Sequence, residues 1–272
     1  MTSATIDLPG ARLRYRLDGP AHAPAVVLAC SLGTALEMWA GQMNALTTRF
    51  RVLRHDMRGH GESSVSTIPV DVPRLAGDVL SLLDAVGVAS AHVVGLSLGG
   101  MVGLWLGAHH PDRVASLVLS NTAALIGTRE SWNARIAAAT NGGMSAISEA
   151  VLDRWFTPDF RAREALWVDG LRRMLLATSV PGYVAACAAI RGTDLRQAVA
   201  RVRVSTLVIT GAFDLATPPN DGRWVAERIT SARLVELPAA HLSNIEAEPA
   251  WNESVLAFLS EGEKANGRAR ET

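Results

Sequence analysis

Cysteine is scarce in this sequence. Cys30 and Cys187 are the only two among 272 residues, and they do not form a C-x-x-C pair. Two isolated cysteines argue against a disulfide framework and against a zinc site. We expect both side chains to be buried as small apolar groups.

A net charge and a long apolar run are also missing. Lys plus Arg and Asp plus Glu number 26 each, so no net field attracts nucleic acid or an anionic membrane surface. Residues 1–16 lack the basic and apolar regions of a signal peptide, and no stretch approaches the roughly 18 apolar residues of a membrane span. We therefore expect a cytoplasmic protein that acts on a small molecule and has no nucleic-acid or membrane partner.

Strand and helix patterns alternate along most of the chain. Continuous apolar runs, which are typical of strands covered on both faces, are followed by helical patterns. This order implies right-handed crossovers and an α/β fold with a mostly parallel central sheet flanked by helices. A hairpin of edge strands, residues 4–8 and 11–17, precedes the alternating part of the chain. The predicted strands are residues 4–8, 11–17, 25–30, 51–56, a run ending at Leu96, 115–119, 204–211 and 234–237.

The alternation stops between residues 125 and 195, where only helical patterns occur, at about 129–140, 144–155, 160–178 and 182–191. We interpret this block as a helical cap inserted into the sheet domain. A final amphipathic helix is predicted from about Glu248 to Leu259. The predicted organisation is therefore a core of residues 1–124 and 196–261, a cap of residues 125–195, and a tail of residues 262–272 that we expect to be disordered.

Ser97 lies in a turn of small residues, Gly95-Leu96-Ser97-Leu98-Gly99, between a predicted strand and a predicted helix. Glycine at both ends allows a sharp bend that exposes the hydroxyl at the carboxyl end of the strand, as in a G-x-S-x-G nucleophile elbow. The pentapeptide alone fits an ordinary turn with an N-cap serine about equally well. The choice between the two depends on partners elsewhere in the chain.

Asp214 and His241 are the predicted partners of Ser97. A serine hydroxyl needs a base to accept its proton and a carboxylate to orient that base. Both residues directly follow predicted strands, so they reach the same edge of a parallel sheet as Ser97. After the strand that ends at Leu119, the corresponding position is Asn121, which favours Asp214 as the carboxylate. The alternative is a turn aspartate and an unrelated histidine.

Two backbone N–H groups are candidates for an oxyanion hole. One belongs to Leu98, directly after the nucleophile, and the other to Leu32, in the loop after residues 25–30. The loop from Asp56 to Gly61 lacks the spacing and lysine of a phosphate loop. We interpret this loop as a structural turn, in preference to a catalytic role for His60.

At this point residues 24–260 resemble an α/β-hydrolase with an inserted cap, and more narrowly the bacterial 3-oxoadipate enol-lactonases. The triad is generic to hydrolases, whereas segments in the cap and after His241 are the specific part. The chain departs from many hydrolases in having Cys30-Ser31 where they have His-Gly. The resemblance rests on Ser31-Leu32-Gly33-Thr34, residues 95–103, Arg154-Trp155-Phe156-Thr157-Pro158, Gly182-Tyr183, residues 187–191 and residues 239–246.

The resemblance implies hydrolysis of 3-oxoadipate enol-lactone to 3-oxoadipate through an acyl-enzyme, without a metal ion or organic cofactor. This small anionic lactone carries a free carboxylate, for which a cation should face the site. The candidates are Arg135 and Arg191, with Trp132 and Trp155 as apolar walls. For each arginine, a solvated surface role is an equally good interpretation.

Other interpretations stay open. A general carboxylesterase or a cofactor-free haloperoxidase-like enzyme would use the same triad, and a non-catalytic binding protein could keep the fold. A haloalkane dehalogenase fits less well because it requires a carboxylate at position 97. The sequence gives no expectation for the oligomeric state.

Overall fold

The computed structural model describes the backbone of residues 3–270 and the side chains of residues 3–261. Within them, eight strands form one sheet in the order β1-β2-β4-β3-β5-β6-β7-β8. The pairs β1–β2 and β2–β4 are antiparallel, and all other pairs are parallel. The strands are β1 (Ala4–Leu8), β2 (Ala11–Asp18), β3 (Ala25–Ala29), β4 (Arg51–His55), β5 (Ala91–Leu96), β6 (Val114–Ser120), β7 (Thr206–Gly211) and β8 (Ala232–Leu237).

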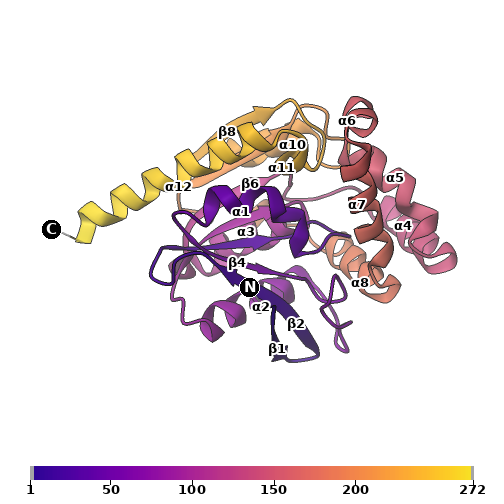
Figure 1. The fold of residues 1–272 in the computed structure, drawn as a ribbon, viewed down its shortest axis with the longest axis horizontal. Helices are drawn as coiled ribbons and strands as arrows, with labels where there is room; N and C mark the ends of the chain where they lie inside the picture. Colours follow the sequence, from indigo (N-terminus) through magenta and orange to yellow (C-terminus); the bar gives the residue numbers. More distant parts are fainter. Residues whose placement is uncertain (1–2, 271–272) are drawn as a thin grey trace.

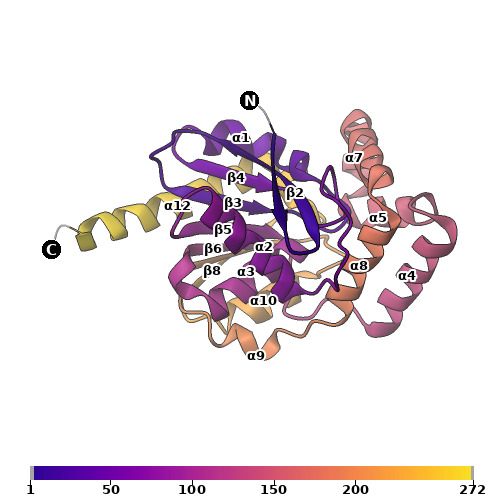
Figure 2. The ribbon, with the colours of Figure 1, turned by 90° about the horizontal axis from the view of Figure 1, so that it is seen from below.

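Helices cover both faces of the sheet, which explains why every residue of β5 is buried. Helices α1 (Ala40–Leu46) and α12 (Glu248–Arg270) pack together on one face. Helices α2 (Val72–Ala85), α3 (Leu98–His109) and α10 (Pro219–Ala226) cover the other, and Figure 2 shows α1 and α10 on opposite sides of the strands. The predicted α/β fold is confirmed.

Local signals place several of these elements. Asp71 caps α2 by accepting a hydrogen bond from the Arg74 N–H at 2.8 Å, as its position before an amphipathic pattern indicates. Short pieces complete the core: the 3₁₀ helices η1 (Leu36–Trp39) and η2 (Pro111–Arg113), and helices α9 (Arg196–Val199) and α11 (Ser243–Glu246). Both cysteines are free and buried, as expected.

Five of the six helices that the structure describes between β6 and β7 form a separate layer, the cap, which gathers at one end of the molecule in Figure 1. The sequence predicts one helix over about 160–178, but the structure has two. The break comes at Glu164, whose φ of −112° and ψ of 40° depart from helical values. The cap helices are α4 (Arg129–Gly142), α5 (Ser145–Trp155), α6 (Pro158–Arg163), α7 (Ala165–Ala177) and α8 (Val180–Arg191).

Helix α12 continues to Arg270, past the end that the sequence predicts near Leu259. It extends away from the body of the molecule on the side opposite the cap (Figure 1). The side chains of residues 262–272 lie outside the described residues, so the expected disorder of this tail stays a prediction. The same holds for the exact domain boundaries.

No single helix of the described backbone is both long and apolar enough to cross a membrane. Helices α7 and α8 pass such a test only as a pair, by length and composition, and they meet at 93°.

Candidate active site

Ser97 occupies a strained turn between β5 and α3. Its φ is 58° and its ψ is −114°, in the left-handed half of the backbone map that side-chain-bearing residues rarely enter. A Cβ on Gly95 would lie 2.1 Å from the Gly99 carbonyl oxygen, and one on Gly99 would lie 2.1 Å from the Ala29 carbonyl oxygen. The Ser97 hydroxyl does not cap α3. The turn is therefore a tightly packed elbow rather than an ordinary N-cap.

Asp214 and His241 follow β7 and β8, and both side chains are buried. The Asp214 Oδ2 atom lies 2.8 Å from the His241 Nδ1 atom. Asp214 also accepts hydrogen bonds from the Thr217 N–H at 3.0 Å and the Thr217 hydroxyl at 2.7 Å. Burial opposes its ionisation, but His241 and these donors hold the pKa of Asp214 below its ordinary value. An ionised Asp214 fixes the Nδ1–H tautomer of His241 and leaves Nε2 free to accept a proton.

Asn121 contacts the triad. From the sequence alone, it was considered only as a position where a catalytic carboxylate could have been but is not. Its Nδ2 donates to Asp214 Oδ2 at 3.0 Å and to the Ala240 carbonyl at 3.1 Å. It has a φ of 47°, which makes it and Ser97 the two residues other than glycine with positive φ among the described ones. The sequence signal that could have identified it is its place directly after β6, at the same sheet edge as Ser97.

Ser97 and His241 line the same cavity, of about 540 Å³, between the sheet edge and the cap. The predicted residues Leu32, Trp132, Arg135 and Trp155 also line it. Asp214 lies behind His241, so the structure brings the three triad candidates to one place. Arg154 and Tyr183 line the cavity as well.

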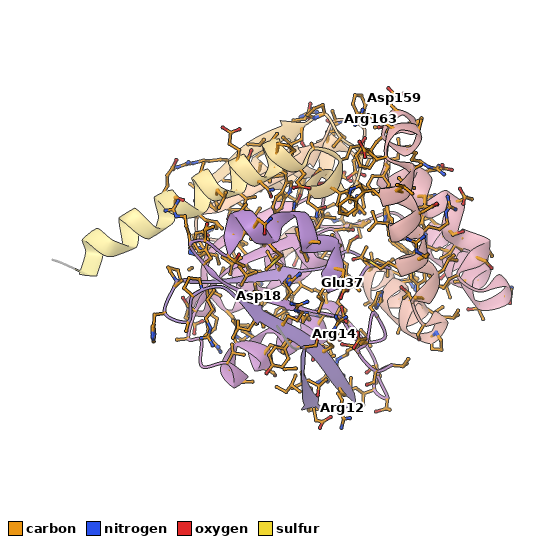
Figure 3. All side chains as sticks on the ribbon, viewed as in Figure 1. Arg12, Arg14, Asp18, Glu37, Asp159 and Arg163 are labelled. Atoms are coloured by element: carbon orange, nitrogen blue, oxygen red, sulfur yellow. The ribbon has the colours of Figure 1, made fainter. Side chains whose placement is uncertain are left out.

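The loop with the predicted oxyanion donor Leu32 is held at its end by an ion cluster around the buried side chain of Asp56. Asp56 accepts the Leu36 N–H at 2.7 Å and lies 3.2 Å from the Arg14 guanidinium, which reaches Glu37 at 2.6 Å. Figure 3 shows Arg14 and Glu37 close together. No hydrogen bond from the N–H of Leu32 or Leu98 occurs within the described residues. Both donors are available for an oxyanion.

Cys30, at the start of the same loop, is turned into the core. Its Sγ lies 3.5 Å from the His55 carbonyl oxygen. Burial raises the pKa of the Cys30 thiol well above its ordinary value, so it stays protonated. Cys30 therefore adds no reactive group to the cavity, whereas Ser31, the second residue that departs from His-Gly, lines it.

The two predicted arginines have different surroundings. Arg135 on α4 lines the cavity, with its guanidinium 5.0 Å from the Trp132 ring centre. Arg191 does not line it, and the end of its side chain donates to exposed Asn133 at 2.6 Å. The reason is orientation: Arg191 is the last residue of α8 and points along the outside of the cap.

Arg154 on α5 is the cavity cation that sequence reasoning missed, although it lies in one of the segments that carry the resemblance. Its guanidinium donates to the Ala150 carbonyl at 2.7 Å. Burial, and then the positive charge of Arg135, lower the pKa of Arg154. No acidic side chain lines the cavity within the described part, and none pairs there with Arg135 or Arg154. The cap side of the cavity is thus positively charged and unneutralised.

Tyr183 on α8 completes this side of the cavity. It is buried, and burial raises the pKa of its phenol, which keeps it neutral. A neutral phenol donates a hydrogen bond to an anion.

His60 does not take part. It is fully buried away from the cavity lining, its Nδ1 lies 3.1 Å from the Arg58 carbonyl oxygen, and burial lowers its pKa to about 4. These facts fit the structural turn that the sequence predicts. Among the side chains that the structure describes, no group of three or more His, Cys, Asp or Glu is arranged to hold a metal ion.

A family model described as alpha/beta hydrolase fold matches residues 24–248. The chain belongs to the α/β-hydrolase family. It is 36% identical to 3-oxoadipate enol-lactonase 2 of Acinetobacter baylyi, over 94% of this hydrolase and 96% of that protein. The crystal structure of the enol-lactonase from Burkholderia xenovorans LB400 has a TM-score of 0.93 and 45% identity, covering 94% of this hydrolase and all of that chain.

A second group of relatives has other names. A RutD protein of Caulobacter sp. (strain K31), named for carbamate hydrolysis, is 32% identical over 91% of this hydrolase and 94% of that protein. The family and the resemblance to enol-lactonases are thus confirmed. The choice of substrate requires a separate argument from the site.

Proposed function

We propose that this hydrolase opens the lactone ring of 3-oxoadipate enol-lactone to give 3-oxoadipate. One observation carries the proposal: Arg135 and Arg154 face the cavity of Ser97 with no acidic lining residue among those described. Two unpaired guanidinium groups in a partly buried cavity repel one another, and a carboxylate-bearing substrate relieves that repulsion. The enol-lactone combines such a carboxylate with a reactive ring carbonyl. The similarity to enol-lactonases supports the same substrate.

In the first step, the Ser97 oxygen attacks the lactone carbonyl while His241 Nε2 accepts the hydroxyl proton. The N–H groups of Leu32 and Leu98 stabilise the oxyanion that forms. Ring opening breaks the bond between the acyl carbon and the ring oxygen. The leaving group is an enolate, whose carbon takes the proton that His241 removed from Ser97 and becomes part of a ketone, which leaves His241 neutral for the second step.

In the second step, His241 takes a proton from water, and the resulting hydroxide attacks the acyl-enzyme. The bond to Ser97 breaks, its oxygen recovers a proton from His241, and the diacid is released. Asp214 stays ionised throughout and stabilises the imidazolium. This chemistry needs no metal ion or organic cofactor. Arg135, Arg154 and neutral Tyr183 hold the substrate carboxylate, and Trp132 and Trp155 contact the ring.

A substrate panel tests the proposal. Enol-lactone, p-nitrophenyl acetate and a small carbamate are compared at one pH by kcat/KM, with Ser97→Ala as the inactive control. We expect the enol-lactone to be preferred by about 100-fold or more, since its carboxylate can pair with the two arginines that have no acidic partner in the cavity. A higher kcat/KM for the neutral ester or the carbamate would contradict the proposal.

The same protein separates a hydrolase from a binding protein with the same fold. A fluorophosphonate probe should label Ser97 in the native chain, and the label should be absent from Ser97→Ala. Tight lactone binding without labelling or turnover would favour the binding protein.

A further inference from the structure

The loop that carries His241 is attached to the cap by main-chain hydrogen bonds. The N–H of His241 donates to the Arg154 carbonyl at 3.4 Å, and the N–H of Leu242 donates to the Trp155 carbonyl at 3.0 Å. Arg154 and Trp155 end helix α5, and both side chains line the cavity. The catalytic base and the substrate-binding face of the cap therefore meet at one junction.

Glu246 joins the two sides of this junction with its side chain. Its Oε2 accepts the N–H of Ala240, the residue before His241, at 2.8 Å. Its Oε1 accepts the N–H of Thr157 at 3.2 Å and a short hydrogen bond from the Thr157 hydroxyl. Thr157 is the N-cap of α6 and follows directly after α5 and Phe156. One half-buried carboxylate thus connects the His241 loop to the turn between two cap helices.

The backbone of Ala240 is consequently held at both its N–H and its carbonyl group. Asn121 donates to its carbonyl at 3.1 Å, and Glu246 accepts from its N–H. Hydrogen bonds to a charged group are about twice as strong as those between neutral groups. Because Ala240 precedes His241, these bonds fix the backbone from which the imidazole projects.

We propose that Glu246 is a positioning residue that sets the place of the His241 imidazole relative to Ser97 and couples it to the cap. A shift of α5 on binding of a ligand to Arg154 is transmitted to His241 through this junction. The proposal rests on the serine-hydrolase site and is independent of which lactone the enzyme accepts.

The test uses the rate constant of Ser97 inactivation by a fluorophosphonate, which requires no assigned substrate. Glu246→Gln removes the charge and one acceptor position. The inactivation rate constant is divided by the fraction of titratable sites, meaning the fraction of the protein whose Ser97 the probe labels at completion. Misfolded protein therefore does not count. We expect this rate constant to fall about tenfold, because a misplaced base loses proton-transfer geometry. With p-nitrophenyl acetate, kcat should fall by a similar factor while KM stays within about twofold.

Two further variants make the result specific. Thr157→Val removes only the hydroxyl donor on the cap side and should lower the same rate constant by a smaller factor, about threefold. Glu149→Gln is the matched control, because Glu149 lies on α5 but pairs with Arg161 and Arg172 on the cap surface. It should leave the rate constant within about twofold of wild type.

A rate constant for Glu246→Gln that stays within twofold of Glu149→Gln would overturn the proposal, even if Glu246→Gln lowers the melting temperature. Loss of titratable sites alone, without slower labelling, would also overturn it and assign Glu246 a purely structural role. Wild-type protein that is not labelled at all would contradict the serine-hydrolase site itself, which is a distinguishable result.

Discussion

The cavity has two unlike sides. On the sheet side, Ser97, Asp214 and His241 are held by strained turns and a dense set of hydrogen bonds. On the cap side, Arg135 and Arg154 face the cavity without an acidic partner in the described part of the chain. The charged groups of the sheet side are paired with one another, whereas the cap side carries two positive charges that an anionic substrate would neutralise. We infer that the sheet side supplies the reaction and the cap side supplies the choice of substrate.

Removing the nucleophile should have the largest effect on this comparison. Ser97→Ala is expected to lower kcat/KM by about 10⁴-fold or more for every substrate, charged or neutral, since covalent catalysis is lost. Ser148 is a cap serine outside the cavity lining, so Ser148→Ala is the control and should have the same kcat/KM as wild type. Steady-state rates on the enol-lactone and on p-nitrophenyl acetate measure both. Retained acyl-enzyme formation by Ser97→Ala would assign the nucleophile elsewhere.

Asp214→Asn should come next. The amide keeps the shape of the side chain but favours the wrong tautomer of His241, so we expect kcat to fall by about 10²–10⁴-fold with little change in KM. Single-turnover kinetics separate this loss from any change in binding. An unchanged kcat would show that another carboxylate orients the base.

Changes on the cap side should act on binding and discriminate between substrates. Arg154→Leu is expected to raise KM for the anionic enol-lactone by about 10–100-fold and to leave KM for p-nitrophenyl acetate within about threefold. Arg191→Leu, outside the cavity, should change neither constant appreciably.

The stability of Arg154→Leu tests whether the two cavity arginines repel one another. Because Arg135 and Arg154 repel one another, Arg154→Leu should unfold at an equal or higher temperature than wild type. Equal effects of Arg154→Leu on the two substrates, together with lower stability, would indicate a structural arginine.

The smallest effect on turnover is expected from a substitution of His60, which belongs to neither side of the cavity. Its effect should be on stability instead. The pKa of His60 is lowered to about 4 by burial, so the unfolded chain binds its proton more readily than the native one. Its contribution to stability is therefore complete above about pH 6.5 and is lost progressively as the pH falls toward 4. Between pH 7 and pH 5, wild type should lose about 1–2 kcal/mol more unfolding free energy than His60→Gln in urea titrations. Equal losses would contradict this assignment.

The sheet side could be predicted from the sequence because its geometry is local to strand ends. Gly95 and Gly99 mark the elbow, and Asp214 and His241 each follow a strand of a parallel sheet. Such a sheet brings the carboxyl ends of its strands to one edge, whatever the length of chain between them. The two hydrogen bonds of Asn121 were not predictable in this way, because a position at a strand end does not determine which side-chain and backbone groups a residue bonds.

The cap side was predictable only in part. Which arginine reaches the cavity depends on how α4, α5 and α8 rotate and cross, and a shift of one residue moves a side chain by about 100° around a helix. Sequence reasoning selected Arg135 and Arg191, whereas the structure places Arg135 and Arg154 at the cavity. The split between α6 and α7 at Glu164 was missed because no Gly or Pro marks it.

Recognition of the substrate carboxylate by the cap is the central feature of the proposed function. The most direct measurement compares kcat/KM for the enol-lactone with kcat/KM for the methyl ester of its side-chain carboxylate, which has the same ring and reacting carbonyl but no charge. Wild type should prefer the free acid by about tenfold or more, and the double variant Arg135→Leu/Arg154→Leu should lose that preference. Equal kcat/KM values for the acid and its methyl ester in wild type would contradict the account.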